Sequence, residues 1–436
     1  MTAYLLERAW VDGAVHDGVL VAVEAGRFTE VRLAEGPAVP DVVRVPGLTV
    51  PGLANAHSHA FHRALRGRTQ RGSGTFWTWR DQMYAVAERL DPDGYRELAR
   101  AAYREMVAAG ITTVGEFHYL HHQPDGTPYD EPNEMGLALV EAAREAGLRI
   151  TLLDTCYLSA GFGRPPEGVQ RRYSDGTADA WAERAALLGP AAGVVHGAAI
   201  HSVRAVPRDQ LGTVVAAATG RPLHVHLSEQ VAENDGCRAA YGVTPTRLLS
   251  DAGALGPLTS AVHATHLTTD DVDLLGDSRT SACFCPTTER DLADGIGPSR
   301  RLHERGSPLT VGSDSHAVVD LFEEMRAVEL DERLATQERG HWTAAELLAA
   351  ATYDGHASLG FPDAGRIALG QRADLVTLDT ASPRTAGTGA DEQTVVFAAS
   401  AADVTQVMVD GRVVVRQGDR EQIGRELDAA IGRLWT

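Results

Sequence analysis

Three histidines fall within six residues near the start of the chain. The segment from Pro51 to Gly67 reads PGLANAHSHAFHRALRG and contains His57, His59 and His62. In an extended strand, residues two apart point to the same face, so the imidazoles of His57 and His59 can approach one ion. Each would give one ring nitrogen, at ~2.0–2.1 Å for zinc. Two histidines hydrogen-bonded in a loop would show the same pattern, so a metal site requires further ligands.

Further candidate ligands stand at the ends of other apolar runs. His226 ends the run PLHVH, and Asp314 lies in VGSDSH. Three imidazole nitrogens and one carboxylate oxygen would make a shell that zinc accepts, with room for a water molecule. His224 offers a second His-x-His pair with His226; we interpret His226 as the ligand and His224 as structural.

The elements that must position these side chains are eight apolar runs separated by helical patterns. They read LTVPGLANAH, ITTVGEFHYL, LRITLLDTCYL, GVVHGAAIHSV, PLHVHLSE, SAVHATHL, TSACFCP and PLTVGSDSH. This alternation predicts an α/β protein with a (β/α)8 barrel of the TIM type. An open doubly wound sheet is the alternative, but it would usually carry a glycine-rich phosphate loop after its first strand, and GLANAHSHAF is not one. Functional groups collect at the C-terminal ends of barrel strands, which is where the titratable residues of these runs stand.

The two ends of the chain share a different pattern. Short β-rich runs broken by Asp-Gly and Ala-Gly turns occur both near the start and in the last 75 residues or so, which predicts one small antiparallel unit built from both termini. We expect residues 1–50 plus 363–436 to form this small β-sandwich domain, and residues 51–362 to form the barrel. Helical stripes predict helices over 94–109 and 320–334, with an insertion over 76–90 after the first run.

The composition and net charge of the chain exclude some classes of binding partner. The chain of 436 residues has a formal net charge of −19, which argues against nucleic acid or an anionic membrane as a partner. No stretch approaches the ~20 apolar residues of a membrane span, and the N-terminus lacks the features of a signal peptide. The four cysteines lack the spacing of a structural zinc site, and we expect Cys283 and Cys285 to be small buried thiols. A cytoplasmic location fits these features.

Several of these segments resemble one enzyme superfamily over essentially the whole chain. PGLANAHSHAFHRAL, HVHLSEQ, AVHATHL, VGSDSH and GRIALGQRADLV resemble the amidohydrolase superfamily in its cytosine-deaminase-like branch. Within that branch, FWTWRDQMY, EFHYLHH, HSVRAV and CPTTERDLADG resemble the formimidoylglutamate deiminase family, whose members act in histidine breakdown.

The resemblance implies one divalent metal ion, with zinc as the default, bound by His57, His59, His226 and Asp314. A cation lowers the pKa of its bound water, and Asp314 would accept the proton that this water loses. Glu229 would shuttle protons to the imine nitrogen, so that ammonia leaves from N-formimino-L-glutamate and N-formyl-L-glutamate remains. His263 would orient the attacking group or stabilise the tetrahedral centre. The alternatives from the residues alone are a helix cap for Glu229 and His266 in place of His263.

The expected substrate carries two carboxylates, which arginine binds in a bidentate fork. The resemblance points to Arg80 in WTWR and Arg204 in HSVR for this role, with Tyr119 and His201 as hydrogen-bond donors beside them. The family pattern has glutamine where this chain has His62. Histidine has a shorter reach and can become charged, so we expect His62 to line the substrate pocket with altered contacts.

Two other functions fit parts of the pattern. The same machinery could deaminate a purine, a pyrimidine or another amidine-like compound. A barrel that had lost its metal could serve as a non-catalytic binding protein, although such a protein would be expected to lack some of the ligands. By resemblance and by base rate we expect a homodimer.

Overall fold

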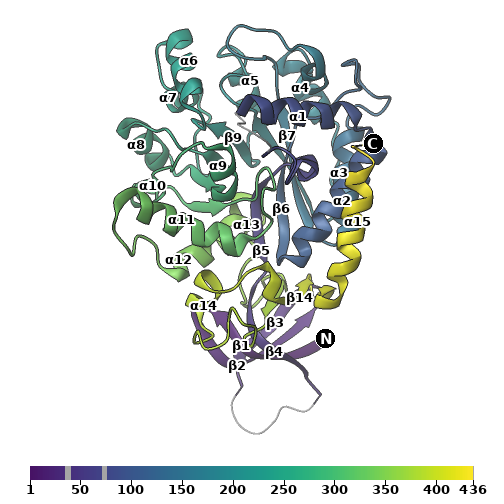
Figure 1. The fold of residues 1–436 in the computed structure, drawn as a ribbon, viewed down its shortest axis with the longest axis vertical. Coiled ribbons are helices and arrows are strands. Elements are labelled where there is room, and N and C mark those ends of the chain that lie inside the picture. The colour runs from purple at the N-terminus through teal and green to yellow at the C-terminus, as the bar shows by residue number, and fades with distance from the viewer. Residues whose placement is uncertain (35–40, 71–75, 436) are drawn as a thin grey trace.

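The computed structural model describes residues 1–34, 41–70 and 76–435, and it places a large barrel above a small sheet (Figure 1). The eight barrel strands are β5 (Leu53–Ser58), β6 (Ile111–His118), β7 (Arg149–Cys156), β8 (Val194–Ile200), β9 (Leu223–Leu227), β10 (Thr259–His263), β11 (Ser281–Phe284) and β12 (Leu309–Val311). They follow one another in chain order, and neighbouring strands are parallel. Each of the eight apolar runs holds one of these strands, so the predicted barrel is confirmed.

The barrel closes between its last and first strands at the histidine-rich segment. Ser58 and Asp314 form a parallel bridge, the Asp314 N–H donates to the His57 carbonyl at 3.0 Å, and the His59 N–H donates to the Asp314 carbonyl at 3.1 Å. These backbone hydrogen bonds bring Asp314 beside the two histidines although more than 250 residues separate them.

Helices cover the outside of the barrel. The barrel helices are α2 (Pro92–Ala108), α3 (Glu134–Ala146), α4 (Ala178–Ala185), α5 (Leu211–Ala217), α6 (Val231–Tyr241), α7 (Pro245–Asp251), α8 (Thr269–Asp277), α9 (Pro286–Leu292), α10 (Ser299–Glu304), α11 (Leu321–Thr336), α12 (Ala344–Ala349) and α13 (Gly355–Ser358). Two of them fall where the sequence predicted helices, and both begin at an aspartate: Asp91 accepts from the Gly94 N–H, and Asp320 accepts from the Phe322 and Glu323 N–H groups. Such caps satisfy the amide groups that the first turn leaves unpaired.

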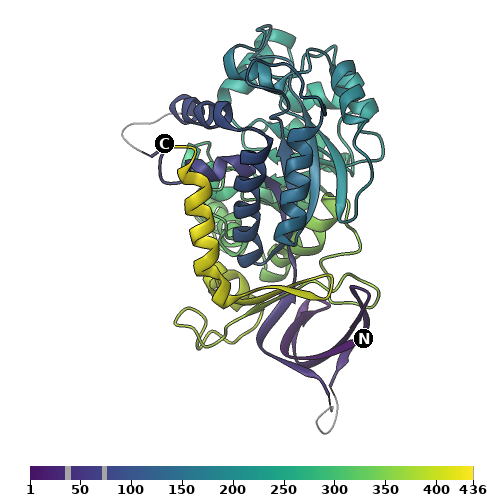
Figure 2. The ribbon, with the colours of Figure 1, turned by 90° about the vertical axis from the view of Figure 1, so that its right-hand side faces the viewer.

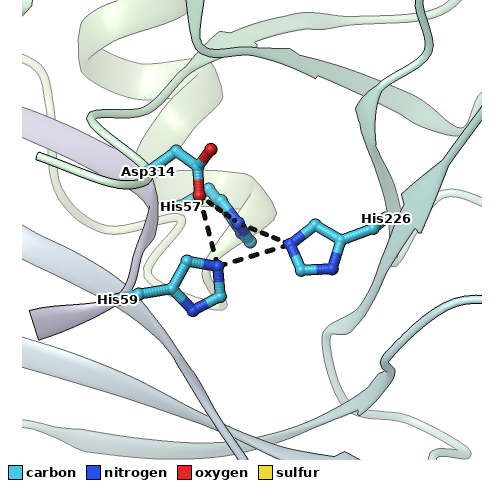
Figure 3. Close-up of side chains that lie close together, drawn as sticks. All are labelled: His57, His59, His226 and Asp314. Carbon is cyan, nitrogen blue, oxygen red and sulfur yellow. Dashed lines mark hydrogen bonds and ion pairs between the residues drawn. The ribbon is translucent and has the colours of Figure 1, made fainter. Parts of the chain in front are cut away.

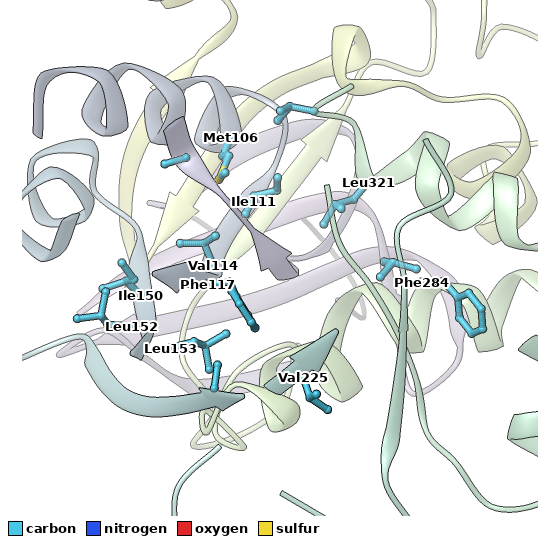
Figure 4. Close-up of a cluster of buried hydrophobic side chains, with 14 of the residues drawn as sticks. Met106, Ile111, Val114, Phe117, Ile150, Leu152, Leu153, Val225, Phe284 and Leu321 are labelled. Atoms are coloured by element: carbon cyan, nitrogen blue, oxygen red, sulfur yellow. The ribbon is translucent and has the colours of Figure 1, made fainter. Parts of the chain in front are cut away.

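The insertion after β5 lies near the C-terminal end of the barrel strands. It contains a short 3-10 helix, Ala60–Leu65, and α1 (Phe76–Arg89), which forms the segment expected as an insertion over 76–90. Below it, apolar side chains from the strands and helices form the barrel core. Figure 4 shows part of this core, including Ile111, Val114, Phe117, Leu153 and Val225.

The chain termini together form the small sheet. It contains β1 (Thr2–Val11), β2 (Ala14–Glu24), β3 (Arg27–Leu33), β4 (Val43–Pro51), β13 (Leu375–Leu378), β14 (Val404–Val409) and β15 (Arg412–Arg416), in the order β15-β14-β13-β4-β1-β2-β3. Only β1 and β4 pair in parallel; the other described pairs are antiparallel, as expected. The β1–β2 hairpin turns at Asp12 and Gly13, whose φ angles are 50° and 85°, the left-handed values that a two-residue Asp-Gly turn requires.

The small sheet curves around its own core. Leu6 and Val21 of the N-terminal strands share one apolar cluster with Leu375 and Met408 of the C-terminal strands. Figure 2 shows the curved sheet below the barrel and the C-terminal helix α15 (Arg420–Gly432) running up the outside of the barrel. There Ile423 and Leu427 pack against Ala101 of α2. The remaining helix, α14 (Glu392–Phe397), lies beside α11 and α12.

The helices and the cysteines can be compared with the expectations from the sequence. In the described parts of the chain, no helix combines the length and the apolar character needed to cross a membrane. The four cysteines are all free and buried, as expected for Cys283 and Cys285.

Candidate active site

Four side chains converge at the C-terminal end of the barrel (Figure 3). His57 is the last residue but one of β5, His59 follows this strand, His226 is in β9, and Asp314 follows β12. The Nε2 atom of His226 lies 3.1 Å from that of His57 and 3.3 Å from that of His59. The Oδ1 atom of Asp314 lies 3.3 Å from His57 Nε2 and 3.2 Å from His59 Nε2.

These spacings fit a single divalent cation. Tetrahedral ligands at ~2.0–2.1 Å from zinc stand about 3.3 Å from one another. The four distances given above are close to this value, and all four residues are buried. Three imidazole nitrogens packed this closely, with no cation between them, would leave lone pairs facing one another. The geometry therefore fits the ligand set that the sequence indicated.

Backbone contacts fix the orientation of two of the imidazoles. His59 Nδ1 donates to the Phe117 carbonyl at 3.1 Å, and His226 Nδ1 donates to the His201 carbonyl at 2.9 Å. A proton on Nδ1 leaves the Nε2 lone pair free for a metal ion, which is the usual arrangement of a ligating histidine. These backbone contacts thus hold both rings in an orientation that suits metal binding.

The electrostatics of the cluster keep its groups in the forms that bind metal. Burial lowers the pKa of His57 to about 4 and lowers the pKa of His226 well below its ordinary value. Burial alone would raise the pKa of Asp314, but its contacts with His57 and His59 hold that pKa well below the usual range. At neutral pH the two histidines are neutral and the aspartate is ionised, as ligands must be.

Glu229 and His263 stand beside the cluster. His263 Nε2 lies 4.0 Å from Glu229 Oε1 and 3.7 Å from Asp314 Oδ2. Burial works against a charge on His263, yet Glu229, Glu289 and Asp314 together raise its pKa well above the ordinary value. The site therefore holds a cationic imidazole next to a carboxylate, both directed at the same space.

Glu289 is a residue of this site that the sequence analysis did not single out. It lies in α9, and its Oε1 accepts from the Cys285 N–H at 2.9 Å and from His263 Nδ1 at 3.2 Å. This contact turns the Nε2 edge of His263 toward Glu229 and Asp314. The signal was present in the segment CPTTERDLADG, but the sequence does not show that its glutamate reaches back across the strand end.

Several backbone angles around the site are unusual. Ser228, His263, Ala264, Asp314 and His316 all have positive φ, between 41° and 69°. Such angles cost non-glycine residues of order 1–3 kcal/mol each and persist where the surrounding structure over-determines them. Here they turn His263 and Asp314 inward at the point where their strands end.

His59, His226 and Asp314 of the cluster lie on the wall of a cavity. Glu229 and His263 line it together with all five residues expected to bind substrate: His62, Arg80, Tyr119, His201 and Arg204. Aromatic side chains form much of the remaining wall: Trp79, Tyr84, Tyr157 and Tyr173. The cavity thus combines a metal-binding end with a wall that carries two arginines.

The two arginines differ in their surroundings. Arg204 Nε donates to Glu233 Oε2 at 3.2 Å, and Glu233 is itself fully buried, so this edge of the guanidinium is held in place. Arg80 comes from α1, and its guanidinium lies 5.3 Å from the centre of the Tyr84 ring. A charge in each position meets the need of an anionic ligand in a protein with a net charge of −19.

His62 takes part in a small polar and aromatic group. Its Nε2 lies 2.8 Å from the Tyr119 hydroxyl, and its ring packs edge-on against Trp79 with centroids 5.1 Å apart. Burial lowers the pKa of His62 well below its ordinary value. His62 is therefore a neutral wall residue, and it is not one of the four clustered ligands.

The competing histidines lie elsewhere. His224 is buried, with its ring centroid 6.5 Å from that of His57, and it is outside the cluster. His266 Nε2 donates to the Asp294 carbonyl at 2.7 Å, whereas His263 faces the cluster. The structure thus places the chosen member of each pair at the site.

Comparison with known proteins identifies the family of this chain. The model of the amidohydrolase family matches residues 48–414. Formimidoylglutamate deiminase from Pseudomonas aeruginosa is 38% identical over 413 residues, which is 90% of each chain. A 5-methylthioadenosine/S-adenosylhomocysteine deaminase from Halobacterium salinarum is 30% identical over 94% of this chain and 90% of that protein.

Among solved structures, an amidohydrolase from Brucella melitensis superimposes with a TM-score of 0.92 at 30% identity, covering 100% of both chains. The family match spans the barrel strands that carry all four clustered residues. With its closed parallel barrel and its His-x-His, His and Asp cluster at the strand ends, this chain belongs to the amidohydrolase family.

Proposed function

We propose that this protein hydrolyses N-formimino-L-glutamate to N-formyl-L-glutamate and ammonia, as a metal-dependent hydrolase of carbon–nitrogen bonds. The observation that carries the proposal is one cavity that combines the cluster of His57, His59, His226 and Asp314 with Arg80 and Arg204 on its wall. A linear amidine with two carboxylates needs both features. The 38% identity to a formimidoylglutamate deiminase supports the same substrate.

The four clustered residues would hold one divalent ion, and their three nitrogens and one oxygen favour zinc. When bound, such an ion lowers the pKa of water near it and provides a nucleophile at neutral pH. Asp314 is ionised and can take a proton from the attacking water. Glu229 would then carry a proton to the departing nitrogen, because ammonia is a far better leaving group than the amide anion.

His263 contributes charge. Its raised pKa keeps the imidazole protonated, and its Nε2 edge faces the space between Glu229 and Asp314. A fixed positive charge there stabilises the negative charge that develops as water adds to the carbon–nitrogen double bond. The overall change is balanced: water adds, the bond to the terminal nitrogen breaks, and ammonia and a formyl group result.

Arg80 and Arg204 would bind the two carboxylates at the other end of the substrate. Glu233 fixes one edge of Arg204 and leaves the rest of the guanidinium for a ligand, while Tyr119 and His201 line the same cavity. His62 would act through its contact with the Tyr119 hydroxyl, which it can orient toward the substrate.

The finer parts of the proposal are one zinc ion per subunit, a place in histidine degradation, a cytoplasmic location and a homodimer. The ligand set supports the ion, and the resemblance to formimidoylglutamate deiminase supports the pathway and the location. Homodimers are the commonest oligomers of soluble proteins. Elemental analysis and light scattering of the purified protein test the ion and the dimer.

An ammonia-release assay tests the activity. The metal-loaded protein is incubated with N-formimino-L-glutamate and, separately, with guanine, cytosine and adenosine. We expect ammonia and formylglutamate only from the first compound. A faster reaction with a nucleobase or nucleoside would favour the alternative that the similarity to the Halobacterium deaminase offers. No reaction with any compound, from protein that takes up no metal, would support a non-catalytic barrel.

Two arginine variants test the carboxylate contacts. Arg204→Ala and Arg80→Ala should raise KM by ten- to hundredfold or more, since each charged hydrogen bond lost costs about 1.5–3 kcal/mol. Both should retain wild-type metal content. Arg208→Ala is the matched control, because Arg208 lies four residues beyond Arg204 and is exposed. Wild-type KM values in both test variants would remove the carboxylate assignment.

A further inference from the structure

Three adjacent strands bring a cysteine to the edge of the metal-binding cluster. His263 ends β10, Cys285 follows β11 and Asp314 follows β12, and these strands are neighbours in the barrel. One nitrogen of His263, the Cys285 sulfur and one oxygen of Asp314 all lie within 4.8 Å of one another, and the three residues are buried. The hydrolysis proposed above gives Cys285 no role.

The two carboxylate oxygens of Asp314 face different groups. Oδ1 is the atom near His57 and His59, whereas Oδ2 lies 3.7 Å from His263 Nε2. That distance is a few tenths of an ångström longer than the ~3.3–3.5 Å expected between a nitrogen and an oxygen ligand of one tetrahedral zinc ion, so it suits a cation with longer bonds. A carboxylate can bridge two metal ions ~3.5–4 Å apart, so an ion at Oδ2 need not displace an ion at Oδ1.

We propose that His263, Cys285 and Asp314 form a second cation site, which takes a thiophilic divalent cation such as Cd²⁺ or excess Zn²⁺. A ligand set of one sulfur, one imidazole nitrogen and one carboxylate oxygen favours these ions over Mg²⁺ or Ca²⁺. On binding, the sulfur–hydrogen bond of Cys285 and the Nε2–hydrogen bond of the protonated His263 both break. A sulfur–metal bond and a nitrogen–metal bond form, and both protons leave to solvent. No oxidation or reduction is involved.

The charges around this second site favour a cation. Glu289 Oε1 lies 3.2 Å from His263 Nδ1, and Glu229 Oε1 lies 4.0 Å from His263 Nε2, so carboxylates flank the histidine on both edges. A second group of possible ligands, formed by His118, His121 and Asp154 on β6, the segment after it and β7, lacks this excess of negative charge. There Arg184 donates to both oxygens of Asp154 at 2.8 Å and already supplies the positive charge.

Occupation of the second site should inhibit the enzyme. The cation would take the Nε2 atom of His263 and the Oδ2 atom of Asp314, two residues to which the proposed mechanism gives a role in hydrolysis. This consequence rests on the proposed function, whereas the binding itself does not. The two can therefore be measured separately.

The binding test uses the full-length protein stripped of metal and titrated with Cd²⁺. The cluster of His57, His59, His226 and Asp314 contains no sulfur, so the first equivalent should add no thiolate-to-metal charge-transfer absorption in the ultraviolet. The second equivalent should add it. Cys285→Ser should bind one equivalent and show no such band, while Cys156→Ser, which removes a buried thiol at the end of β7, should behave as wild type.

Two further measurements keep the proposal falsifiable if Cys285→Ser does not fold. X-ray absorption of wild-type protein should show sulfur scattering around cadmium at two equivalents and none at one. Cys283→Ser should retain the band, because Cys283 is not among the three ligands. Absence of sulfur around cadmium in the wild type, or a band that depends on Cys283 and survives in Cys285→Ser, would overturn the proposal.

The inhibition test compares rates with and without excess Zn²⁺ for each variant, relative to its own rate at one equivalent. In excess Zn²⁺, the rates of wild type and Cys156→Ser should fall at least tenfold. The rate of Cys285→Ser should fall much less. A second cadmium seen by absorption with no loss of activity would support the site and contradict the roles given to His263 and Asp314 in hydrolysis.

Discussion

At the scale of single residues, the site depends on carboxylates that hold histidines in place. Asp314 faces the paired histidines with one oxygen and His263 with the other, and Glu289 holds the far edge of His263. An imidazole can rotate and can carry its proton on either nitrogen, so a fixed acceptor at Nδ1 decides which edge faces the substrate. These contacts make Glu289 a positioning residue for His263.

Glu289→Gln should keep the shape of this contact and remove its charge. The pKa of His263 would fall, because Glu289 is one of the groups that raise it, and the alkaline limb of the kcat/KM profile should move to lower pH. We expect kcat to fall by about ten- to hundredfold, at the lower end of general acid–base contributions. KM and metal content should stay near wild type, and the measurement is steady-state kinetics from pH 5 to about pH 10.

Glu324→Gln is the matched control for this experiment. Glu324 is also buried, and it accepts from the N–H of Thr287 on the same helix, α9, without contacting His263. It should change stability and leave the pH profile alone. A shift of equal size in both variants would mean that Glu289 acts only through the helix.

Asp294 is a buried acid near the site whose pKa is raised. Burial and the nearby Glu229 raise the pKa of this carboxyl to about 8. Its Oδ1 accepts from Gln230, and its Oδ2 has no hydrogen-bond partner within the described chain. The folded protein thus holds a proton that the unfolded chain, with a pKa of ~3.9, releases readily.

Asp294→Asn should therefore stabilise the metal-free protein at alkaline pH. A raised pKa in the folded state means that wild-type stability falls, relative to the variant, as pH rises from about 4 to about 8. We expect the variant to gain on the order of 1–3 kcal/mol in the free energy of unfolding at pH 8 and little at pH 4. Urea unfolding at both values measures this, and an equal difference at the two pH values would contradict it.

At the scale of elements, the segment that follows β5 must be held rigidly because it carries His57 and His59. Glu116 of β6 holds this segment in place. Its Oε1 accepts from the Ala60 N–H at 2.6 Å, and its Oε2 accepts from the Ser58 hydroxyl at 2.8 Å. The Ser58 hydroxyl also lies 2.9 Å from His316 Nε2, so β5, β6 and the segment after β12 meet at one point. Burial raises the pKa of Glu116 to about 7.

Glu116→Ala should loosen the metal-binding cluster. Removing both acceptors frees the backbone on either side of His59, and we expect metal affinity to fall by about 10–100-fold, as it does when contacts that orient metal ligands are lost. Competition with a chromogenic chelator measures the affinity.

Glu329→Ala is the control for Glu116→Ala. Glu329 is fully buried and accepts from the N–H groups of Gly340 and Trp342, neither of which belongs to the cluster. Both variants should lose stability, but only Glu116→Ala should lose metal affinity. Unchanged affinity in Glu116→Ala would show that the strands alone hold the ligands.

At the scale of the whole molecule, a buried ion pair joins the barrel to the small sheet. Arg149 begins β7, and its guanidinium donates to Asp374, which immediately precedes β13, and to Asp410 at 3.2 Å. The side chains of Arg149 and Asp374 are 2% and 1% exposed. With α15 packed on α2, this contact ties the C-terminal segment, residues 374–435, to the barrel.

Arg149→Ala should destabilise the protein by about 3–5 kcal/mol, because it leaves the Asp374 carboxylate buried without its partner. Arg149→Ala combined with Asp374→Asn should recover part of this loss. Arg144→Ala, which removes an exposed pair with Glu141, should change the free energy of unfolding by less than ~1 kcal/mol. Thermal and urea unfolding measure all three, and a loss for Arg149→Ala no larger than that control would contradict the role given to the pair.

The sequence by itself determined the strands of the barrel, their order and the residue types at their ends. Apolar runs must be buried and helical stripes must cover them, so eight alternations leave few folds to choose from. The Asp-Gly and Ala-Gly turns likewise marked the hairpins of the small sheet, because left-handed backbone angles favour those residues. His57, His59, His226 and Asp314 could be chosen for their chemistry and their position after each run.

Only the tertiary structure decided which side chains touch. Glu289, Glu116 and Arg149 act across gaps in sequence of 26, 56 and 225 residues, and no local pattern encodes such contacts. The parallel pairing of β1 with β4, the packing of α15 on the barrel and the proximity of Cys285 to the cluster have the same origin. Spacing along a chain fixes the direction of neighbouring side chains, but distances between remote side chains depend on how the strands close and pack.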